Sequence, residues 1–291
     1  MKNILVTGAY GQLGNEIRIL SANYPQYNFM FTDVDSLDIT DKSELIDFVT
    51  GNDIRYIINC AAYTAVDKAE DETQLCEKIN ATAVKNLGIA AAEASAGIVH
   101  VSTDYVFDGS SCKPYSEDMP TKPCSVYGKT KLKGEKNLLK ACPNAIILRT
   151  AWLYSPFGNN FVKTMIKLGS ERDSLNVIFD QVGTPTYAED LADTILKIMD
   201  QTIDTQHDKA GIYHFSNEGV CSWYDFTLKI HEIAGIKTCK VNPIGTKDYP
   251  TKAARPHYSV LNKTKIKQAF NITIPHWEAS LIKCIKELSN L

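Results

Sequence analysis

Two side chains four residues apart in the segment YGKTK, Tyr127 and Lys131, could act together in proton transfer. In a helix this spacing places both on one face. A tyrosine hydroxyl can protonate the alkoxide that forms when a ketone is reduced, and a nearby ammonium in a water-poor site would lower the pKa of the phenol toward neutrality. The same spacing also arises by chance, and the alternative is an exposed surface pair.

A second polar stretch, STDYVFDG at 102–109, directly follows the apolar run AGIVHV. Open α/β sheets bind their ligands at the carboxyl ends of strands. We therefore expect the Thr103 hydroxyl to hydrogen-bond a substrate carbonyl oxygen beside Tyr127, the alternative being a hydroxyl that caps the strand end. Thr103, Tyr127 and Lys131 together predict the reduction of a ketone by a nicotinamide cofactor.

A glycine-rich stretch near the start of the chain, VTGAYGQLG, follows an apolar run and opens a helical pattern. Glycines at this spacing permit a tight turn and let backbone N–H groups approach a pyrophosphate at the helix N-terminus. The residues expected at the pyrophosphate are Gly8, Gly11, Gln12, Leu13 and Gly14.

Asp33 ends the next apolar run, about twenty residues further on, which is the usual place for a carboxylate that accepts hydrogen bonds from the adenosine ribose. No Arg or Lys stands beside it in the sequence to favour a 2′-phosphate. The pattern therefore favours NADH over NADPH.

The segment INCAAYTAVDKAE at 58–70 follows the third apolar run. Its small residues Ala61 and Ala62 would let a cofactor pass close to the backbone, and Tyr63 and Val66 would then lie beside the nicotinamide or the substrate. The alternative is a small-residue turn that packs on the next helix.

Scattered residues in the second half fit a nucleotide-sugar substrate, which needs aromatic surface, amides for hydroxyl groups and an arginine for a diphosphate. They are Trp152, Asn160 in GNNF, the loop DQVGTPT at 180–186, and Arg255 in RPHYS. Trp152 could instead belong to the core, and Arg255 to a surface ion pair.

The elements that must position these residues alternate from the start of the chain. Continuous β-branched and apolar runs, typical of parallel strands covered on both faces, are separated by segments of helix length at 11–22, 41–51, 72–95 and 125–141. This order predicts an α/β fold with a doubly wound parallel sheet of the Rossmann type. We expect a nucleotide-binding domain at 1–150, joined by parts of 181–215, and a smaller, interleaved substrate domain mainly at 151–291.

Composition narrows the class of protein further. The 291 residues carry a net charge of −3 spread along the chain, which argues against a nucleic-acid or membrane-surface binder. The first apolar run is too short for a signal peptide or a membrane span, so we expect a cytoplasmic protein. The eight cysteines lack zinc spacing, and we expect reduced thiols and no protein-bound metal from them.

The motifs in this order resemble the dTDP-4-dehydrorhamnose reductases, a family of extended short-chain dehydrogenases/reductases. The resemblance spans about residues 1–262 and includes LDITD, NCAAYTAVDKAE, STDYVFDG, RTAWLYS, DQVGTPT and RPHYSVL. It implies NADH- or NADPH-dependent reduction of the 4-keto group of dTDP-4-dehydro-L-rhamnose to dTDP-L-rhamnose.

Family roles carry over to Thr103 as the partner of the substrate oxygen, Tyr127 as the proton donor, and Lys131 as its electrostatic support and a ribose contact. The resemblance also implies cofactor contacts at Asp38 and Ile39, and substrate contacts at Asp104, Tyr105 and Trp152. Some relatives bind magnesium through glutamates at a dimer contact. No such set is matched in this sequence, so magnesium and a homodimer both stay open.

Two other functions compete with the reductase hypothesis. A nucleotide-sugar epimerase or dehydratase of the same superfamily would keep NAD tightly bound, but DQVGTPT and RPHYS count against it. A non-catalytic accessory subunit, of the kind found with some methionine adenosyltransferases, would be expected to lack Tyr127 or Lys131, and both are present.

Overall fold

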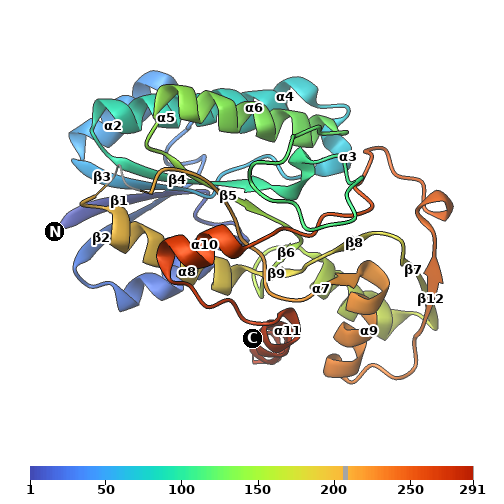
Figure 1. Ribbon diagram of the computed structural model, residues 1–291. Helices are drawn as coiled ribbons and strands as arrows, with labels where there is room; N and C mark the ends of the chain where they lie inside the picture. Colours follow the sequence, from blue (N-terminus) through green and yellow to red (C-terminus); the bar gives the residue numbers. More distant parts are fainter. Residues whose placement is uncertain (206–208, 291) are drawn as a thin grey trace.

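The computed structural model describes residues 1–205 and 209–290. Among these residues, six strands form one parallel sheet in the order β10-β5-β4-β3-β1-β2 (Figure 1). The strands are β1 (Lys2–Thr7), β2 (Tyr27–Thr32), β3 (Ile54–Asn59), β4 (Gly97–Thr103), β5 (Ile146–Thr150) and β10 (Gly211–His214). The predicted doubly wound parallel sheet is confirmed, and the segment GIYHFSN joins it at the edge beside β5.

Helices cover both faces of this sheet, as the continuous apolar runs predicted (Figure 1). In β1, Ile4 and Val6 pack into the cluster formed with α1, α8 and α10, whereas Leu5 points into the opposite cluster with α2, α5 and α6. The covering helices are α1 (Gln12–Leu20), α2 (Lys42–Gly51), α5 (Val84–Glu93), α6 (Val126–Ala141), α8 (Ala188–Thr202) and α10 (Thr264–Phe270).

The chain order reverses between β1 and β3, because β2 lies on one side of β1 and the later strands lie on the other. A crevice outside the carboxyl ends of the strands is expected at such a switch point. Gly8 follows β1 and Ala61 follows β3, and a Cβ on Gly8 would lie 2.6 Å from the Ala61 backbone nitrogen. The two segments predicted to bind a dinucleotide therefore meet at this point.

The segment predicted as one helix over 72–95 contains a local change of pitch. It comprises α4 (Thr73–Glu77), the π-helical η2 (Lys78–Ala83) and α5. The π-helical part lies close against α6, since a Cβ on Gly134 would be 2.1 Å from the carbonyl oxygen of Asn80. Such π-helical turns often accompany functional sites.

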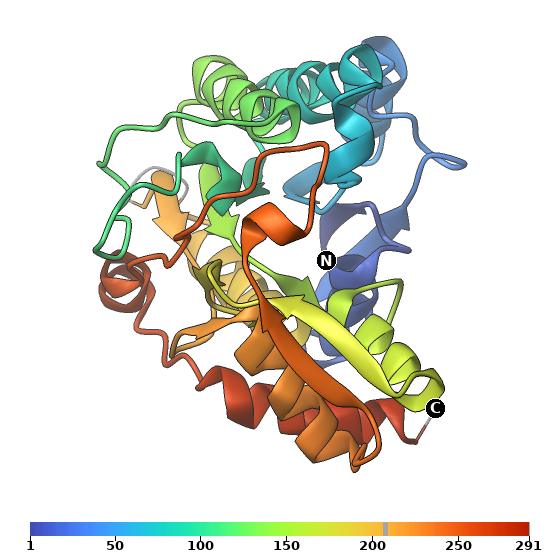
Figure 2. The ribbon, with the colours of Figure 1, turned by 90° about the vertical axis from the view of Figure 1, so that its right-hand side faces the viewer.

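The remaining elements form a smaller layer beside the carboxyl edge of the sheet (Figure 2). Three pairs of short strands and three helices surround a separate apolar cluster that contains Tyr154, Phe226 and Trp277. The strand pairs are β6 (Leu153–Tyr154) with β9 (Thr186–Tyr187), β7 (Ser174–Ile178) with β12 (Lys240–Ile244), and β8 (Val182–Gly183) with β11 (Cys221–Ser222). The helices are α7 (Phe161–Glu171), α9 (Trp223–Ala234) and α11 (Trp277–Leu288).

Helix α9 begins and ends at residues with typical capping geometry. Ser222 and Asp225 form a reciprocal capping box at its start, and Gly235 ends it in the left-handed conformation at φ +70°. Four further short helical turns complete the described elements: α3 (Val66–Ala69), η1 (Ser21–Asn23), η3 (Asp104–Val106) and η4 (Thr246–Asp248).

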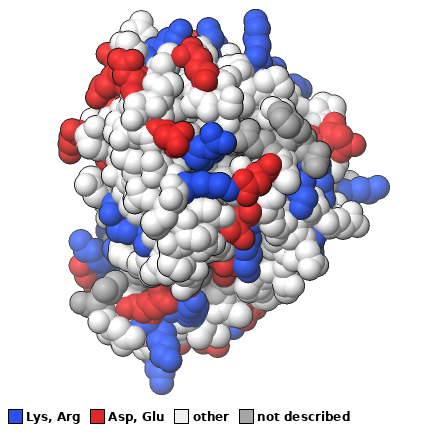
Figure 3. Space-filling model, turned by 90° about the vertical axis from the view of Figure 1, so that its left-hand side faces the viewer, with Lys and Arg blue, Asp and Glu red and all other residues white. Residues whose placement is uncertain are grey.

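The surface carries charges of both signs. Lys and Arg side chains lie among Asp and Glu side chains over the face shown in Figure 3. No helix in the described ranges is long and apolar enough to cross a membrane. All eight cysteines, each within those ranges, are free thiols.

Candidate active site

A cleft of about 660 Å³ opens at the carboxyl ends of β1, β3, β4 and β5. It brings together most of the predicted site residues, although the sequence spreads them over more than a hundred positions. Those that line it are Gly8, Gly11, Gln12, Leu13, Gly14, Asp33, Asp38, Ile39, Ala61, Ala62, Val66, Thr103, Asp104, Tyr105, Tyr127, Lys131 and Trp152. Tyr63, Asn160 and Arg255 are not in this lining.

The glycine loop at one side of the cleft requires glycine for steric reasons. Gly8 has φ +65°, and a Cβ on Gly14 would lie 2.4 Å from the carbonyl oxygen of Gly8. Gly11 is the N-cap of α1 and has no side chain to cap the first N–H groups of this helix. This cradle fits the pyrophosphate of a dinucleotide.

Asp33 lies where the second strand ends, as predicted. Its carboxylate accepts hydrogen bonds from the backbone N–H of Tyr10 at 3.0 Å and of Val34 at 2.9 Å. The guanidinium of Arg18 stacks on the ring of Phe31, 4.2 Å from the ring centre, and lies 5.7 Å from that of Tyr10. The tertiary structure therefore brings a cation to this end of the site that was not apparent from neighbouring sequence.

The floor of the cleft between the two ends is a small-residue turn held by Asn59. Its side-chain oxygen accepts hydrogen bonds from the Thr7 hydroxyl at 2.7 Å and from the Ala61 N–H at 3.1 Å. Tyr63 points elsewhere, because its hydroxyl donates to Glu72 at 2.6 Å. The backbone of Tyr63, rather than its ring, is fixed toward the site, through two hydrogen bonds with the Asn80 side chain of the π-helical turn.

The three predicted catalytic residues meet at the other end of the cleft. The Thr103 hydroxyl donates to Asp104 at 3.0 Å, and the rings of Tyr105 and Tyr127 make an edge contact at 5.5 Å between centres. Lys131 is 2% exposed, and its ammonium donates to the carbonyl oxygen of Val101 at 2.6 Å.

The electrostatics of this end differ from the expectation that Lys131 lowers the pKa of Tyr127. Burial raises the pKa of Tyr127 above its usual value, and the nearby Thr103 hydroxyl offsets only part of that effect. The ammonium of Lys131 is bound to Val101 instead, and burial lowers the pKa of Lys131 to about 8. Tyr127 is therefore a neutral phenol at physiological pH, with its proton available for donation.

Trp152 lines the cleft and supplies aromatic surface to it. It has φ +48° and stacks on Trp223 with ring centres 3.5 Å apart and planes 8° apart. Trp223 was not singled out in the sequence, because it starts a helix 71 positions further along the chain. Trp152 thus both joins the apolar cluster and faces the cleft.

Asn160 and Arg255 act on residues at the border of the cleft. The Asn160 side chain caps α7 and donates to the side-chain oxygen of Gln12 at 3.0 Å. Arg255 forms a two-point ion pair with Asp67 at 2.6 and 3.1 Å, directly after the lining residue Val66. Asp67 carried no signal of its own in the sequence, since its partner is 188 residues away.

Comparisons with known proteins agree with this geometry. A family model described as the RmlD substrate binding domain matches residues 1–290. The chain is 43% identical over 286 residues to a dTDP-4-dehydrorhamnose reductase of Aggregatibacter actinomycetemcomitans, covering 97% of each chain. The chain belongs to the dTDP-4-dehydrorhamnose reductase family.

Solved structures from this reductase family have the same fold. A dTDP-4-dehydrorhamnose reductase of Clostridium acetobutylicum is 44% identical with a TM-score of 0.94, covering 99% of each chain. One from Bacillus anthracis, solved in complex with NADP, is 39% identical with a TM-score of 0.93, covering 99% of this chain and 100% of that one. The predicted α/β class and extended dehydrogenase/reductase fold are confirmed.

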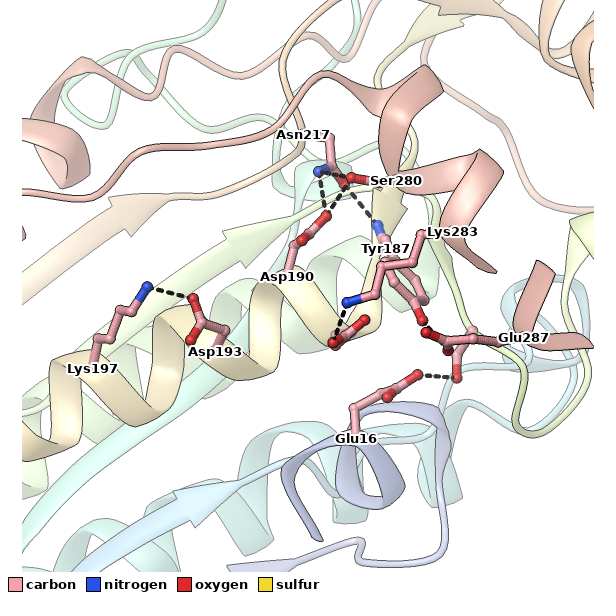
Figure 4. Close-up of polar contacts among 11 residues, drawn as sticks. Glu16, Tyr187, Asp190, Asp193, Lys197, Asn217, Ser280, Lys283 and Glu287 are labelled. Atoms are coloured by element: carbon pink, nitrogen blue, oxygen red, sulfur yellow. Dashed lines mark hydrogen bonds and ion pairs between the residues drawn. The ribbon is translucent and has the colours of Figure 1, made fainter. Parts of the chain in front are cut away.

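Glu16 on α1, Glu189 on α8 and Glu287 on α11 lie close enough to interact electrostatically; Figure 4 labels Glu16 and Glu287. Ser155 donates to Glu16 at 2.8 Å, Lys283 to Glu189 at 2.6 Å, and Tyr187 to Glu287 at 2.7 Å. Each carboxylate is thus engaged by a protein donor. The second oxygen of Glu189, Oε2, is buried and has no hydrogen-bond partner in the described structure. No group of three or more His, Cys, Asp or Glu side chains placed to hold a metal ion is found among residues 1–205 and 209–290.

Proposed function

We infer that this protein reduces the 4-keto group of dTDP-4-dehydro-L-rhamnose to give dTDP-L-rhamnose, using a reduced nicotinamide cofactor. The observation that carries this conclusion is one cleft with a dinucleotide cradle at one end and Thr103, Tyr127 and Lys131 at the other. The cofactor supplies the hydride when bound, and the protein must supply a proton and hold the carbonyl.

The chain's own residues divide this work. Tyr127 carries a proton at neutral pH, as a tyrosine with an ordinary or raised pKa does, and the substrate oxygen takes that proton as it becomes an alkoxide, which is far more basic. Lys131 then stabilises the phenolate that Tyr127 leaves behind, and Thr103 orients the oxygen. Asp104, whose pKa burial raises to about 6, accepts the Thr103 hydroxyl and fixes its direction.

We propose that the cofactor contacts are the glycine loop, Asp33, Asp38, Ile39, Ala61 and Ala62, and that Val66, Asp104, Tyr105 and Trp152 contact the sugar. All of these line the cleft. Tyr63 would contribute through its backbone, Asn160 through Gln12, and Arg255 through Asp67.

We further propose that both cofactors are used and that NADH is preferred. Asp33 at the ribose position would repel a 2′-phosphate, which supports NADH. Arg18 lies beside Tyr10, whose N–H binds Asp33, and would partly neutralise that repulsion. The Bacillus anthracis relative solved with NADP is consistent with use of the phosphorylated cofactor.

The first experiment supplies the purified protein with dTDP-4-dehydro-L-rhamnose and either NADH or NADPH, and follows loss of the reduced nicotinamide together with formation of dTDP-L-rhamnose. We expect stoichiometric loss with both cofactors. Tightly bound NAD without net oxidation would instead indicate an epimerase or dehydratase. If the protein showed no activity and carried no bound cofactor, that result would indicate an accessory subunit.

The organisation of the molecule is also a proposal. We assign residues 1–150, with parts of 181–215, to cofactor binding and 151–291 mainly to substrate binding. β10 belongs to the sheet and α8 packs on it, whereas α7, α9 and α11 surround the separate cluster. A cytoplasmic location is proposed on the short N-terminal apolar run, and a homodimer on the family resemblance. Sedimentation of the purified protein tests the dimer.

A further inference from the structure

A row of polar side chains crosses the sheet face that α6 covers. In the strand register Thr7 lies beside Asn59, Asn59 beside His100, and Ser102 beside Arg149. All of these side chains are buried, at a depth where the strands otherwise carry Leu and Ile. The row ends under the helix that bears Tyr127 and Lys131, where it meets one carboxylate.

That carboxylate is Glu135, which is 1% exposed. It accepts hydrogen bonds from two nitrogens of the Arg149 guanidinium, Nε at 2.9 Å and Nη2 at 2.7 Å, and from the Ser102 hydroxyl at 2.6 Å. Arg149 is itself 2% exposed, and its third nitrogen, Nη1, has no hydrogen-bond partner in the described structure. Removing one member of such a buried pair is costly, because the other charge is left uncompensated.

Glu135 also lies one helical turn beyond Lys131, on the same face of α6. Lys131 donates to the carbonyl oxygen of Val101, and Ser102, the next residue of β4, donates to Glu135. One carboxylate therefore lies between two buried cations, Lys131 and Arg149, and links their helix to the ends of two strands.

We propose that Glu135 is a positioning residue for catalysis: with Arg149 and Ser102 it locks α6 onto β4 and β5 and keeps the Lys131 ammonium charged beside Tyr127. This inference rests on the proposed reductase function. Neither the cleft lining nor the predicted site residues include Glu135 or Arg149.

The charges around Lys131 support this role. Burial lowers the pKa of Lys131, and Glu135 is the largest influence that raises it again, followed by Cys76. The other titratable groups that interact with the catalytic end of α6 are Cys76 on α4, His100 on β4 and Asp104 on η3. Those that interact with Arg149 besides Glu135 are Glu117 and His214. His100 is neutral, because burial and Lys131 hold its pKa well below the usual value. Glu135 is thus the carboxylate that binds Arg149 directly and most raises the pKa of Lys131, while Glu117 also interacts with Arg149.

The test compares Glu135→Gln with wild type across pH 6 to 9. We expect the alkaline midpoint of kcat to fall by about one unit, because the variant leaves Arg149 as an unbalanced buried cation near Lys131. With such a shift, the kcat of the variant would be about twofold below that of wild type at pH 7 and roughly fivefold below it at pH 8. The double variant Glu135→Gln/Arg149→Met removes both charges and should regain part of the lost pH range.

Glu77→Gln is the matched control. Glu77 pairs with Lys133 on the outer side of the same helix, with 44% and 55% of the side chains exposed, and this variant should keep the wild-type pH profile. If Glu135→Gln lowered kcat equally at every pH, or if the double variant matched the single variant, Glu135 would be a structural residue only and the proposal would be overturned.

Direct titration separates this proposal from the proposed function. In protein carrying 13C-labelled lysine, the Lys131 signal, assigned with Lys131→Met, should titrate at a lower pH in Glu135→Gln than in wild type. Absence of wild-type turnover would contradict the reductase function, while the titration would still decide the role of Glu135. If Glu135→Gln does not fold, the Lys131 titration is measured in the double variant instead. Glu135→Asp keeps the carboxylate, so an unchanged Lys131 midpoint and a wild-type pH profile in this variant would support the positioning role of Glu135.

Discussion

At the scale of single residues, the proton of Tyr127 has the most direct consequence. Tyr127→Phe removes the donor while keeping the ring that contacts Tyr105. We expect kcat to fall by about two orders of magnitude, in line with the loss of a general acid. Steady-state assays check this, with the melting temperature and cofactor binding expected to stay near wild type. Turnover close to wild type would remove Tyr127 as the donor.

Asp33 tests the choice of cofactor. Asp33→Ala should weaken NADH more than NADPH, because the carboxylate favours a ribose with a free 2′-hydroxyl and repels a phosphate. Dissociation constants from fluorescence titration measure the two changes. Asp35→Ala, two positions further along and exposed, is the control. Equal losses for both cofactors would show that Asp33 does not recognise the ribose.

The site residues differ in how far the sequence could place them. Thr103, Tyr127 and Lys131 belong to motifs at strand and helix ends, and all three line the cleft. Tyr63 was placed beside the nicotinamide, but its hydroxyl binds Glu72, a neighbour that the local pattern does not reveal. Glu135 and Arg149 gave no signal because a buried ion pair depends on two elements meeting.

At the scale of elements, the glycine loop and α1 depend on close backbone approach. Gly14→Ala should abolish measurable cofactor binding and destabilise the fold by about 1–3 kcal/mol, because its Cβ would lie 2.4 Å from the Gly8 carbonyl oxygen. Gly51→Ala, where a Cβ meets nothing within 4 Å, should change stability by about 0.5–1 kcal/mol at most and leave binding intact. Calorimetric titration and urea unfolding of both variants provide the comparison.

The main strands and helices agree with their predicted positions, since long apolar periodicities and caps are local properties. The π-helical turn within 72–95 was not predicted, because it accompanies the contact between Asn80 and Gly134 of another helix. The two-residue strands β6, β8, β9 and β11 were also missed, because strands so short have no periodicity.

At the scale of the whole molecule, Glu16 couples pH to stability. It is a residue of α1 that is 3% exposed and interacts with Ser155 and Glu287, and burial raises its pKa from 4.5 to about 7. Its contribution to stability is therefore complete below pH 4.5 and is lost as the pH rises through 7. Wild type should lose roughly 2–3 kcal/mol more than Glu16→Gln over this range, measured by urea unfolding. Parallel curves for the two proteins would contradict this.

Arg255 connects distant parts of the chain through Asp67. Arg255→Ala should raise the KM for the nucleotide sugar about tenfold with little change in kcat, because it releases residues 249–258 from the border of the cleft. Lys252→Ala, which removes an exposed pair with Asp71, should leave KM unchanged. A large fall in kcat for Arg255→Ala would point to a role in the chemical step instead.

The sequence by itself determined the α/β class, the order of the main elements, the glycine cradle and the Thr103, Tyr127 and Lys131 constellation, because each depends on local spacing. Tertiary structure decided which charges pair. Arg255 pairs with Asp67, 188 residues away, and Arg149 on β5 pairs with Glu135 on α6. It also decided the pKa direction of Tyr127, since desolvation depends on everything packed around the hydroxyl and not on its neighbours in sequence.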